Sequence, residues 1–449
     1  MAVDPHCSRL VATDAVSLQR HPGAGRAATA TASPTQPKIA VALHDGFYGC
    51  TSGTGFSNRS FLDVLARAMP PGRLLVMPLE IPPSDPSYDP AWVADTERLV
   101  KRAEANVVPI PGGRTATFSV AGCEALCESA MQVAREHLDQ APDTQLIGLD
   151  IPFLGLALQR HFEDQFSLFL VPRSTSELAT PEDQRRVRWE RKGLAAAASS
   201  GARIAAISSH MHHHLAQDYG IPGDTLVDLP NGLILGDLQE TPIAPLPTGA
   251  KAGFILAMGR AVASKGFEDL LEALEILAAR GVEAPHLILA PSTHAEALTT
   301  YQKKLQAMVR DYTIDATFLP RFSPQYRSWL RSPALRAVVV PSRTEPFGRI
   351  PLEAFAAGAA PVVATQAGGL AETVIDGITG FTARPCDPES LADAIGNALR
   401  VSSRDRDRIR TQSQDLLATR HDYEATIRSY LLLHAPWALA PGGAEEARV

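Results

Sequence analysis

Two glutamates eight positions apart carry the strongest chemical signal in the sequence. Glu345 follows a short apolar run, residues 337–340, and Glu353 stands two positions after Pro351, which suits the first turn of a helix. Gly348 between them lets the backbone approach a ligand closely. Because ligands of open parallel sheets bind where strands end, this pattern predicts that both carboxylates face one cleft. Taken singly, each glutamate could equally be a solvated surface residue.

The backbone amides between the two glutamates are candidates for anion binding. The N–H groups of Gly348, Arg349 and Ile350 stand at the predicted start of a helix, where no intrahelical acceptor is available to them. The helix dipole adds to their attraction for negative charge. We therefore predict that Gly348, Arg349 and Ile350 contact a phosphate of a bound nucleotide.

Two cations in one loop form a second candidate site. Arg260 and Lys265 lie five positions apart, directly after a strand predicted at 254–258. Together they could hold both phosphates of a diphosphate leaving group, which is the work of a magnesium ion in other transferases. The alternative is a solvated basic loop before a helix. The place of the loop, at the start of a nucleotide-binding pattern, favours phosphate binding.

A glycine-rich loop lies in the first half of the chain. Gly53 and Gly55 fall between an apolar run, residues 39–43, and the helical pattern of residues 56–68. A strand, a glycine loop and a helix in this order can bring amides to a phosphate, and a plain tight turn is the alternative. We take Gly53 and Gly55 as candidate contacts to the same ligand.

Residues 341–358 resemble the large family of retaining glycosyltransferases called family 4, whose motif is two glutamates separated by seven residues. Residues 360–372 and 376–381 resemble the segments that follow in that family. The resemblance implies a nucleoside-diphosphate sugar as donor. It also implies that Glu353 holds the ribose hydroxyls and that Glu345 contacts the donor sugar.

The same resemblance implies a role for the two cations and a fold for the chain. It implies that Arg260 and Lys265 hold the diphosphate without a metal ion, and that the loop of Gly53 reaches the donor from across a cleft. The implied fold is GT-B, in which two Rossmann-like α/β domains face each other. The implied mechanism is front-face attack, in which the leaving diphosphate accepts the proton of the acceptor. No metal or other cofactor is expected.

The first half of the chain departs from the family pattern. Family members often carry a histidine just past the strand predicted at 167–171, where this chain has Arg173. A common Asn-Gly-hydrophobic-Asp motif is replaced here by Asn231 to Ile234. The resemblance is strong over residues 253–399 and thin before them. The first half therefore predicts the fold rather than particular contacts.

Alternating apolar runs and helical periodicity predict parallel sheets covered by helices. Strands are predicted at 39–43, 74–77, 146–149, 167–171, 204–208, 254–258, 286–290, 316–319, 337–340 and 361–364, and helices at 56–68, 267–279, 295–312, 324–330, 351–357 and 388–399. We divide the chain into a disordered leader (1–37), an acceptor-side domain (38–235), a linker (236–251), a nucleotide-sugar-binding domain (252–420), a helix (421–435) that could pack back on the first domain, and a tail (436–449).

Composition narrows the class of protein. The chain has 449 residues, 20% of them charged, and a net charge of −7, which fits a globular protein and argues against nucleic acid as a partner. Five scattered cysteines do not suggest a disulfide framework. No apolar run approaches the ~20 residues that span a bilayer. Residues 1–37 lack the apolar core of a secretory signal, so we expect a cytoplasmic, bacterial protein; a transit peptide is the alternative.

The run from His210 to His214 could chelate a metal on one helix face, because its two end residues lie at i, i+4 spacing. An exposed helix start is the alternative, and we expect no metal. Whether this run or Arg173 contributes to the site stays open.

These features predict an enzyme, a hexosyltransferase that moves a sugar from a nucleoside-diphosphate sugar to a small-molecule or glycan acceptor. One alternative is a sugar-nucleotide epimerase or hydrolase on the same fold, which would need further acid or base residues in the first domain. Another is a non-catalytic sugar-nucleotide or glycan-binding protein. The sequence specifies neither the acceptor, nor the donor base and sugar, nor the oligomeric state.

Overall fold

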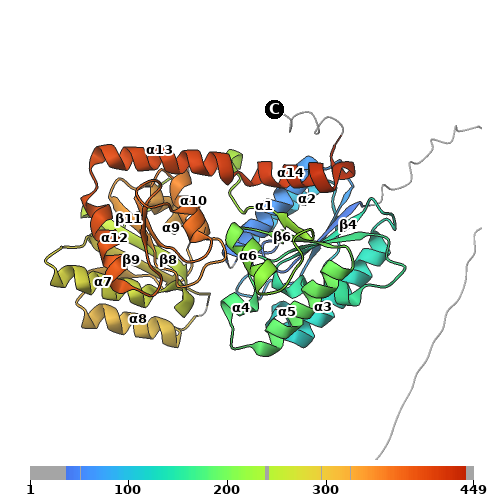
Figure 1. Ribbon diagram of the computed structural model, residues 1–449, viewed down its shortest axis with the longest axis horizontal. Coiled ribbons are helices and arrows are strands. Elements are labelled where there is room, and N and C mark those ends of the chain that lie inside the picture. Colours follow the sequence, from blue (N-terminus) through green and yellow to red (C-terminus); the bar gives the residue numbers. More distant parts are fainter. Residues whose placement is uncertain are drawn as a thin grey trace, which may run out of the picture. The chain divides into compact units, whose positions relative to one another are not determined.

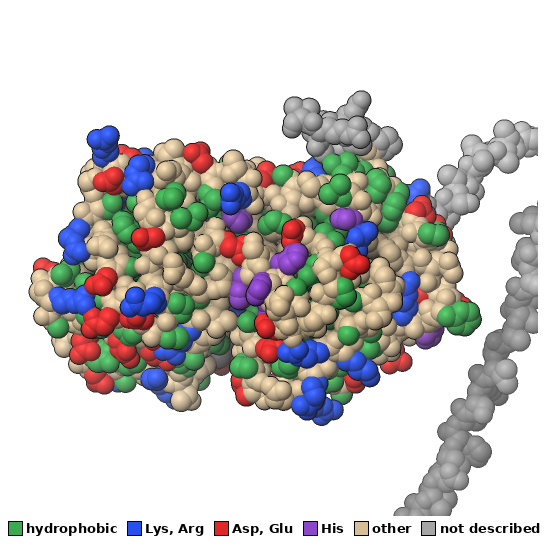
Figure 2. All heavy atoms as spheres, viewed as in Figure 1, with side chains coloured by type: hydrophobic (Ala, Val, Ile, Leu, Met, Phe, Trp, Pro, Cys, Tyr) green, Lys and Arg blue, Asp and Glu red, His purple; other side chains and the backbone are tan. Residues whose placement is uncertain are grey.

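The computed structural model describes residues 37–50, 52–237, 242–294, 296–323, 325–359 and 361–440. The predicted leader except Pro37, part of the predicted linker (238–241) and part of the predicted tail (441–449) lie outside these residues, as do Ala295, Pro324 and Ala360. None of the described helices is both long and apolar enough to cross a membrane. On the face shown in Figure 2, basic and acidic side chains are interspersed.

The first lobe, residues 37–237, is built on a seven-stranded parallel sheet (Figure 1). Its strands are β1 (Ile39–Leu43), β2 (Leu74–Pro78), β3 (Asn106–Val107), β4 (Gln145–Leu149), β5 (Ser167–Val171), β6 (Arg203–Ala206) and β7 (Leu226–Asp228). Their order across the sheet is β3-β2-β1-β4-β5-β6-β7. Every residue of β1, β2 and β4 is buried, which explains why these strands are continuous apolar runs in the sequence.

Capping side chains fix where the helices of the first lobe begin. These helices are α1 (Gly53–Ala68), α2 (Pro90–Arg102), α3 (Val120–His137), α4 (Ser176–Ala179), α5 (Gln184–Ser199) and α6 (Ser209–Gln217). Ser52 caps α1, Asp89 caps α2 and Ser208 caps α6, each through a side-chain oxygen that accepts a backbone N–H. The sequence pattern missed β3 and β7, which are edge strands of two and three residues.

The second lobe, residues 248–420, repeats this plan on a six-stranded parallel sheet. Its strands are β8 (Phe254–Arg260), β9 (His286–Ser292), β10 (Ala316–Phe318), β11 (Leu335–Val340), β12 (Val362–Thr365) and β13 (Phe381–Ala383), in the order β10-β9-β8-β11-β12-β13. Its helices are α7 (Phe267–Ala279), α8 (Thr300–Asp311), α9 (Gln325–Ser328), α10 (Arg349–Ala356), α11 (Leu370–Thr373), α12 (Pro388–Arg400) and α13 (Ser403–Arg420). Each lobe is therefore a Rossmann-like α/β domain, as predicted.

Two helices of the second lobe begin at other residues than predicted. The helix predicted at 295–312 begins only at Thr300, because Thr299 and Gln302 form a capping box there. The helix predicted from Pro351 begins two residues earlier, at Arg349, because Gly348 adopts a φ of +94° at the N-cap position. The start of α10 therefore lies closer to the loop of the first glutamate than the sequence indicates.

After the second lobe the chain returns to the first. Helix α14 (Tyr423–His434) lies beside α1 (Figure 1). Tyr423 is fully buried with its ring 6.5 Å from that of Phe61 in α1, and Tyr430 stacks on Phe169 of β5 at 4.1 Å between ring centroids. The C-terminal helix thus completes the core of the first lobe.

Candidate active site

A cavity of about 730 Å³ is lined by residues of both lobes. The first lobe contributes the start of α1, a 3-10 turn at Arg114–Phe118 and the loop after β5, and the second contributes the loops after β8, β9, β10 and β11. These loops follow the carboxyl ends of parallel strands, where ligands of α/β sheets bind. Every residue predicted to form the site lines this cavity, except Gly55.

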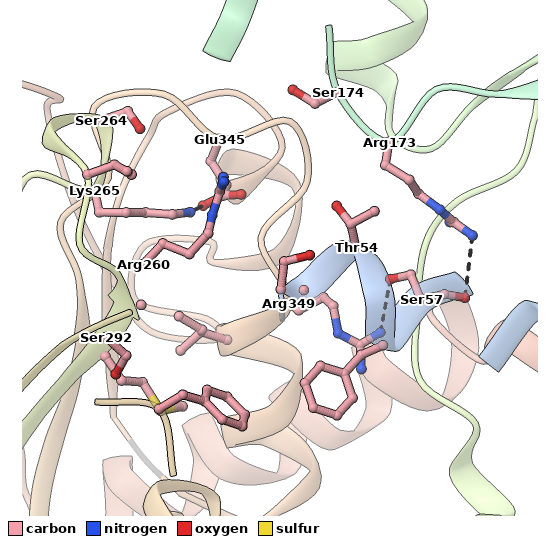
Figure 3. Close-up of a pocket in the computed structure, with 18 of the residues that line it drawn as sticks. Thr54, Ser57, Arg173, Ser174, Arg260, Ser264, Lys265, Ser292, Glu345 and Arg349 are labelled. Carbon is pink, nitrogen blue, oxygen red and sulfur yellow. Dashed lines mark hydrogen bonds and ion pairs between the residues drawn. The ribbon is translucent and has the colours of Figure 1, made fainter. Parts of the chain in front are cut away.

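Arg260, Lys265 and Glu345 converge on one side of the cavity (Figure 3). The ammonium group of Lys265 pairs with the carboxylate of Glu345, which also accepts a 3.3 Å hydrogen bond from the hydroxyl of Ser342. Arg260 is exposed, and within the described part of the chain its guanidinium group has no ion-pair or hydrogen-bond partner. An anion that enters the cavity would therefore meet the unpaired guanidinium of Arg260 and the ammonium group of Lys265, which is already paired with Glu345.

Lys265 and Glu345 lie in the loops after β8 and β11, and Arg260 is the last residue of β8. The two loops are fixed to each other. Arg343 of the second loop forms a bidentate ion pair with Asp269 of α7, with Nε 2.8 Å from Oδ2. Gly266 of the first loop has a φ of +65°, and a Cβ there would lie 1.9 Å from the carbonyl oxygen of Pro341. Only glycine permits this approach, so the two loops form one rigid wall.

Glu353 is held by two arginines. Arg327 of α9 binds both carboxylate oxygens, at 2.9 Å from Nε and 3.1 Å from Nη2, and Nε of Arg349 lies 3.5 Å from Oε1. The guanidinium of Arg327 lies 3.7 Å above the ring of Phe56 in α1. Burial raises the pKa of Glu353, but the two guanidinium groups lower it by a larger amount. The pKa of Glu353 therefore falls below its ordinary value. The carboxylate is ionised at neutral pH, and each oxygen can still accept another donor.

Arg349 reaches from the second lobe to the first. Its Nη1 donates to the hydroxyl of Ser57 at 3.1 Å and to the carbonyl of Gly232 at 3.2 Å (Figure 3). Burial lowers the pKa of Arg349. Its backbone N–H stands with that of Ile350 at the start of α10, where anions are favoured. The side chain of Arg349 therefore bridges the lobes, and its amide remains available to the cavity.

The two predicted glycines of α1 lie in different surroundings. Gly53 lines the cavity, and a Cβ added there would meet Arg349 only at an ordinary 3.5 Å. Gly55 is buried, and a Cβ added there would lie 2.6 Å from the carboxylate of Asp45. Asp45 also accepts a 3.0 Å hydrogen bond from Ser52, the N-cap residue of α1. Gly55 thus allows α1 to pack against Asp45, and Gly53 leaves space at the cavity.

Arg173, which stands where family members often have histidine, is buried and hydrogen-bonded. It donates to Asn58 at 3.2 Å and to the hydroxyl of Tyr423 at 2.7 Å. It also donates to the carbonyl of Ser57 at 3.4 Å (Figure 3). Although it lines the cavity, its donors are used within the first lobe. Arg173 therefore ties α1 to α14.

The histidine run forms the start of α6, where Figure 2 shows histidine side chains at the surface. His214 bonds Thr175 through Nε2 at 2.8 Å and Asp218 through Nδ1 at 2.6 Å. The ring of His210 lies nearly parallel to that of His214, with 6.3 Å between centroids. No group of three or more His, Cys, Asp or Glu among the described residues could hold a metal ion.

Phe56, Ser57 and Arg327 are among the cavity residues that the sequence pattern missed. Phe56 and Ser57 belong to the predicted helix at 56–68, but nothing in their spacing showed that they face the site. Arg327 lies 26 positions before its partner Glu353, on a different element. Only the fold brings these residues together.

Two Rossmann-like lobes, with a charged cavity at the carboxyl ends of both sheets, define the GT-B class of protein. Residues 240–415 match the model of the family described as glycosyl transferases group 1. This part of the chain is therefore similar to the glycosyl transferases of group 1, and family 4 is the narrower assignment predicted from the sequence.

Similar proteins agree with this class. The D-inositol 3-phosphate glycosyltransferase of Paenarthrobacter aurescens is 30% identical over 225 residues, which cover 48% of this chain and 52% of that protein. The chain thus spans about half the length, or less, of the curated relatives it matches. Sucrose-phosphate synthase from Thermosynechococcus elongatus has a similar structure, with a TM-score of 0.68 at 19% identity over 90% of this chain and 99% of that chain. Anabaena Alr3699/HepE in complex with UDP-glucose gives a TM-score of 0.63 at 19% identity, over 89% and 99%.

Proposed function

We propose that this protein is a retaining glycosyltransferase that moves a sugar from a nucleoside-diphosphate sugar to a hydroxyl acceptor, without a metal ion, in the bacterial cytoplasm. The observation that carries the proposal is the arrangement of one cavity wall. Arg260, Lys265, Glu345 and the start of α10 line the same cavity, as does Glu353 within α10. These are the charges and amides that a nucleotide diphosphate requires.

In the proposed complex, the diphosphate lies between the two cations and the free amides of α10. Arg260 supplies an unpaired guanidinium, which can bind phosphate oxygens in a bidentate manner. The amides of Arg349 and Ile350 approach from the helix start, and the start of α1 at Gly53 approaches from the first lobe. Positive charge held in place in this way stabilises a leaving diphosphate without a metal.

Glu353 would accept the two ribose hydroxyls. Arg327 already fixes both of its oxygens in the plane of a bidentate pair, so the carboxylate loses little freedom when the ribose binds. Glu345 would contact the sugar, and its pairing with Lys265 links that contact to the phosphate side of the donor.

Transfer would follow the front-face route. The bond between the anomeric carbon and the diphosphate oxygen breaks, the acceptor oxygen bonds to the same face of that carbon, and the acceptor proton moves to the leaving phosphate oxygen. Arg260 and Lys265 gain interaction energy as negative charge collects on the diphosphate. Electrostatic stabilisation, rather than a protein nucleophile, therefore accounts for the rate.

The proposal is tested by measuring release of nucleoside diphosphate from a panel of UDP-, GDP-, ADP- and TDP-sugars, with and without a mixture of hydroxyl acceptors. UDP-glucose is included because a structural neighbour was solved with it. We expect acceptor-dependent release from at least one donor. Release or epimerisation that is equally fast without acceptor would favour the sugar-nucleotide hydrolase or epimerase, and donor binding without any turnover would favour a non-catalytic binding protein.

The wall contributed by the first lobe supports transfer over the epimerase and hydrolase alternative. Asp85 is the one carboxylate among the described first-lobe residues that line the cavity. It accepts hydrogen bonds from the backbone and side chain of Ser87. An epimerase or hydrolase would need further acid or base groups on this wall.

A further inference from the structure

The lobes also meet at the start of α6. The carboxylate of Glu372, in α11 of the second lobe, accepts hydrogen bonds from the backbone N–H groups of Ser209 at 2.9 Å and His210 at 2.8 Å. Both N–H groups belong to the first turn of α6, a helix of the first lobe. A carboxylate at this place is favoured by the helix dipole as well as by the two bonds. Glu372 of the second lobe thus caps a helix of the first lobe.

Ser208 connects the same helix to the loop of Glu345. Its buried hydroxyl donates to the carbonyl of Pro346 at 2.7 Å and accepts the N–H of Met211 at 3.0 Å. The neighbouring carbonyl, that of Glu345, accepts the N–H of Gly369 at 3.0 Å. The two consecutive carbonyls are therefore held from opposite lobes.

A glycine at position 368 permits the close contact between α6 and the loop of Glu345. Gly368 has a φ of +54°, and a Cβ there would lie 2.2 Å from the carbonyl oxygen of Glu345 and 2.9 Å from the ring of His210. No other residue fits between α6 and the loop without moving one of them.

We propose that Ser208 and Glu372 are positioning residues, which place Glu345 and its partner Lys265 around the donor only when α6 is docked on the second lobe. This inference rests on the proposed function. When α6 separates, three interlobe hydrogen bonds are lost and the Glu345 loop is held by its own lobe alone. Glu353, expected to hold the ribose, and the amides of α10, expected to hold the diphosphate together with the cations, are not bonded to α6, so turnover should fall more than nucleotide affinity.

The experiment compares Ser208→Ala and Glu372→Ala with Ser209→Ala. Ser209 is a matched control, because its side chain is exposed and its variant keeps the N–H group that bonds Glu372. We expect Ser208→Ala and Glu372→Ala to lower kcat by roughly ten- to hundredfold, as small misplacements of catalytic groups do, and to change the Kd for UDP much less. Ser208→Thr, which keeps the hydroxyl, should retain most of the wild-type rate.

A second measurement does not depend on turnover. Small-angle X-ray scattering of the full chain with saturating UDP should give a larger radius of gyration for Ser208→Ala and Glu372→Ala than for wild type and Ser209→Ala. The inference is wrong if these variants match Ser209→Ala in both kcat and scattering, or if kcat, UDP affinity and Tm all fall together. If the wild type transfers no sugar at all, the proposed function fails and the scattering comparison alone decides the inference.

Discussion

The two lobes supply different kinds of group to one cavity. The second lobe supplies most of the charged side chains, among them Arg260, Lys265, Glu345 and the Arg327–Glu353 pair. On the first lobe, the donors of Arg173 are used internally, and the wall includes Phe118, which is 68% exposed.

Under the proposed function, this difference separates chemistry from recognition. Fixed charges stabilise a transition state only if they are placed before the reaction, which the rigid second-lobe loops provide. An exposed aromatic side chain in a cavity is a feature of ligand recognition. We therefore expect substitutions in the second lobe to lower kcat or donor affinity, and those on the first-lobe wall to affect the acceptor.

The largest effect is expected from Arg260→Ala and Lys265→Ala. Each removes a cation that gains interaction energy as the diphosphate leaves, so kcat should fall on the order of 10²-fold or more while the KM for donor changes less. Initial-rate kinetics would measure this. Arg280→Ala is the control, because it removes a half-exposed cation that pairs with Glu389 and Asp393 away from the cavity. An equal loss in the control would mean that overall charge matters rather than the site.

The double variant Lys265→Ala, Glu345→Gln sharpens this test. Lys265→Ala leaves the mostly buried carboxylate of Glu345 without its partner, which costs stability. Neutralising Glu345 as well should restore Tm towards the wild-type value without restoring kcat. A double variant that regains turnover would show that the pair only stabilises the fold.

Glu353→Ala should have the next largest effect, on nucleotide binding. Two ribose hydroxyls would lose a charged acceptor, and each such bond contributes about 1.5–3 kcal/mol, so UDP affinity should fall by at least about tenfold. Isothermal titration with UDP and with the whole donor should show equal losses. Arg327→Ala should weaken UDP less, since it frees the carboxylate rather than removing it. A loss confined to the sugar part of the donor would contradict the ribose assignment.

A smaller effect is expected on the first-lobe wall. Phe118→Ala should raise the KM for acceptor by about two- to tenfold, because an aromatic contact contributes roughly 0.5–1.5 kcal/mol, and should leave UDP affinity unchanged. Phe162→Ala is a matched control, since Phe162 is 92% exposed and is not among the residues lining the cavity. If both variants behave alike, Phe118 does not contact the acceptor.

The smallest effect is expected at the N-terminus. Deleting residues 1–36 should leave Tm and turnover nearly unchanged, because their composition cannot bury a core. Extending the deletion through Lys38 should lower Tm slightly, since Lys38 pairs with Asp139 and Asp143. Thermal unfolding measures both variants. A Tm lower by several degrees for the shorter deletion would show that the leader packs on the protein.

The same contrast between lobes explains what the sequence could predict. In the second lobe, Arg260, Lys265 and Glu345 lie at the end of a strand or within a few residues after it, so that local motifs predicted them at one cavity wall. The first lobe depends on distant contacts, such as the bond between Arg173 and Tyr423 across 250 positions. The pair of Arg327 and Glu353 likewise joins separate helices. Such contacts leave no periodic or spaced signal in the chain.

The most direct test of the central claim is the anomeric configuration of the product formed in excess EDTA. With an α-linked donor sugar of gluco or galacto configuration, ¹H NMR of the product should show the small H1–H2 coupling constant of an α-linkage, and the product should form at the rate measured without EDTA. This result would mean that the second lobe's cations replace a metal ion in a retaining reaction. A β-linked product, or a reaction that stops in EDTA and resumes with Mg²⁺ or Mn²⁺, would contradict the account.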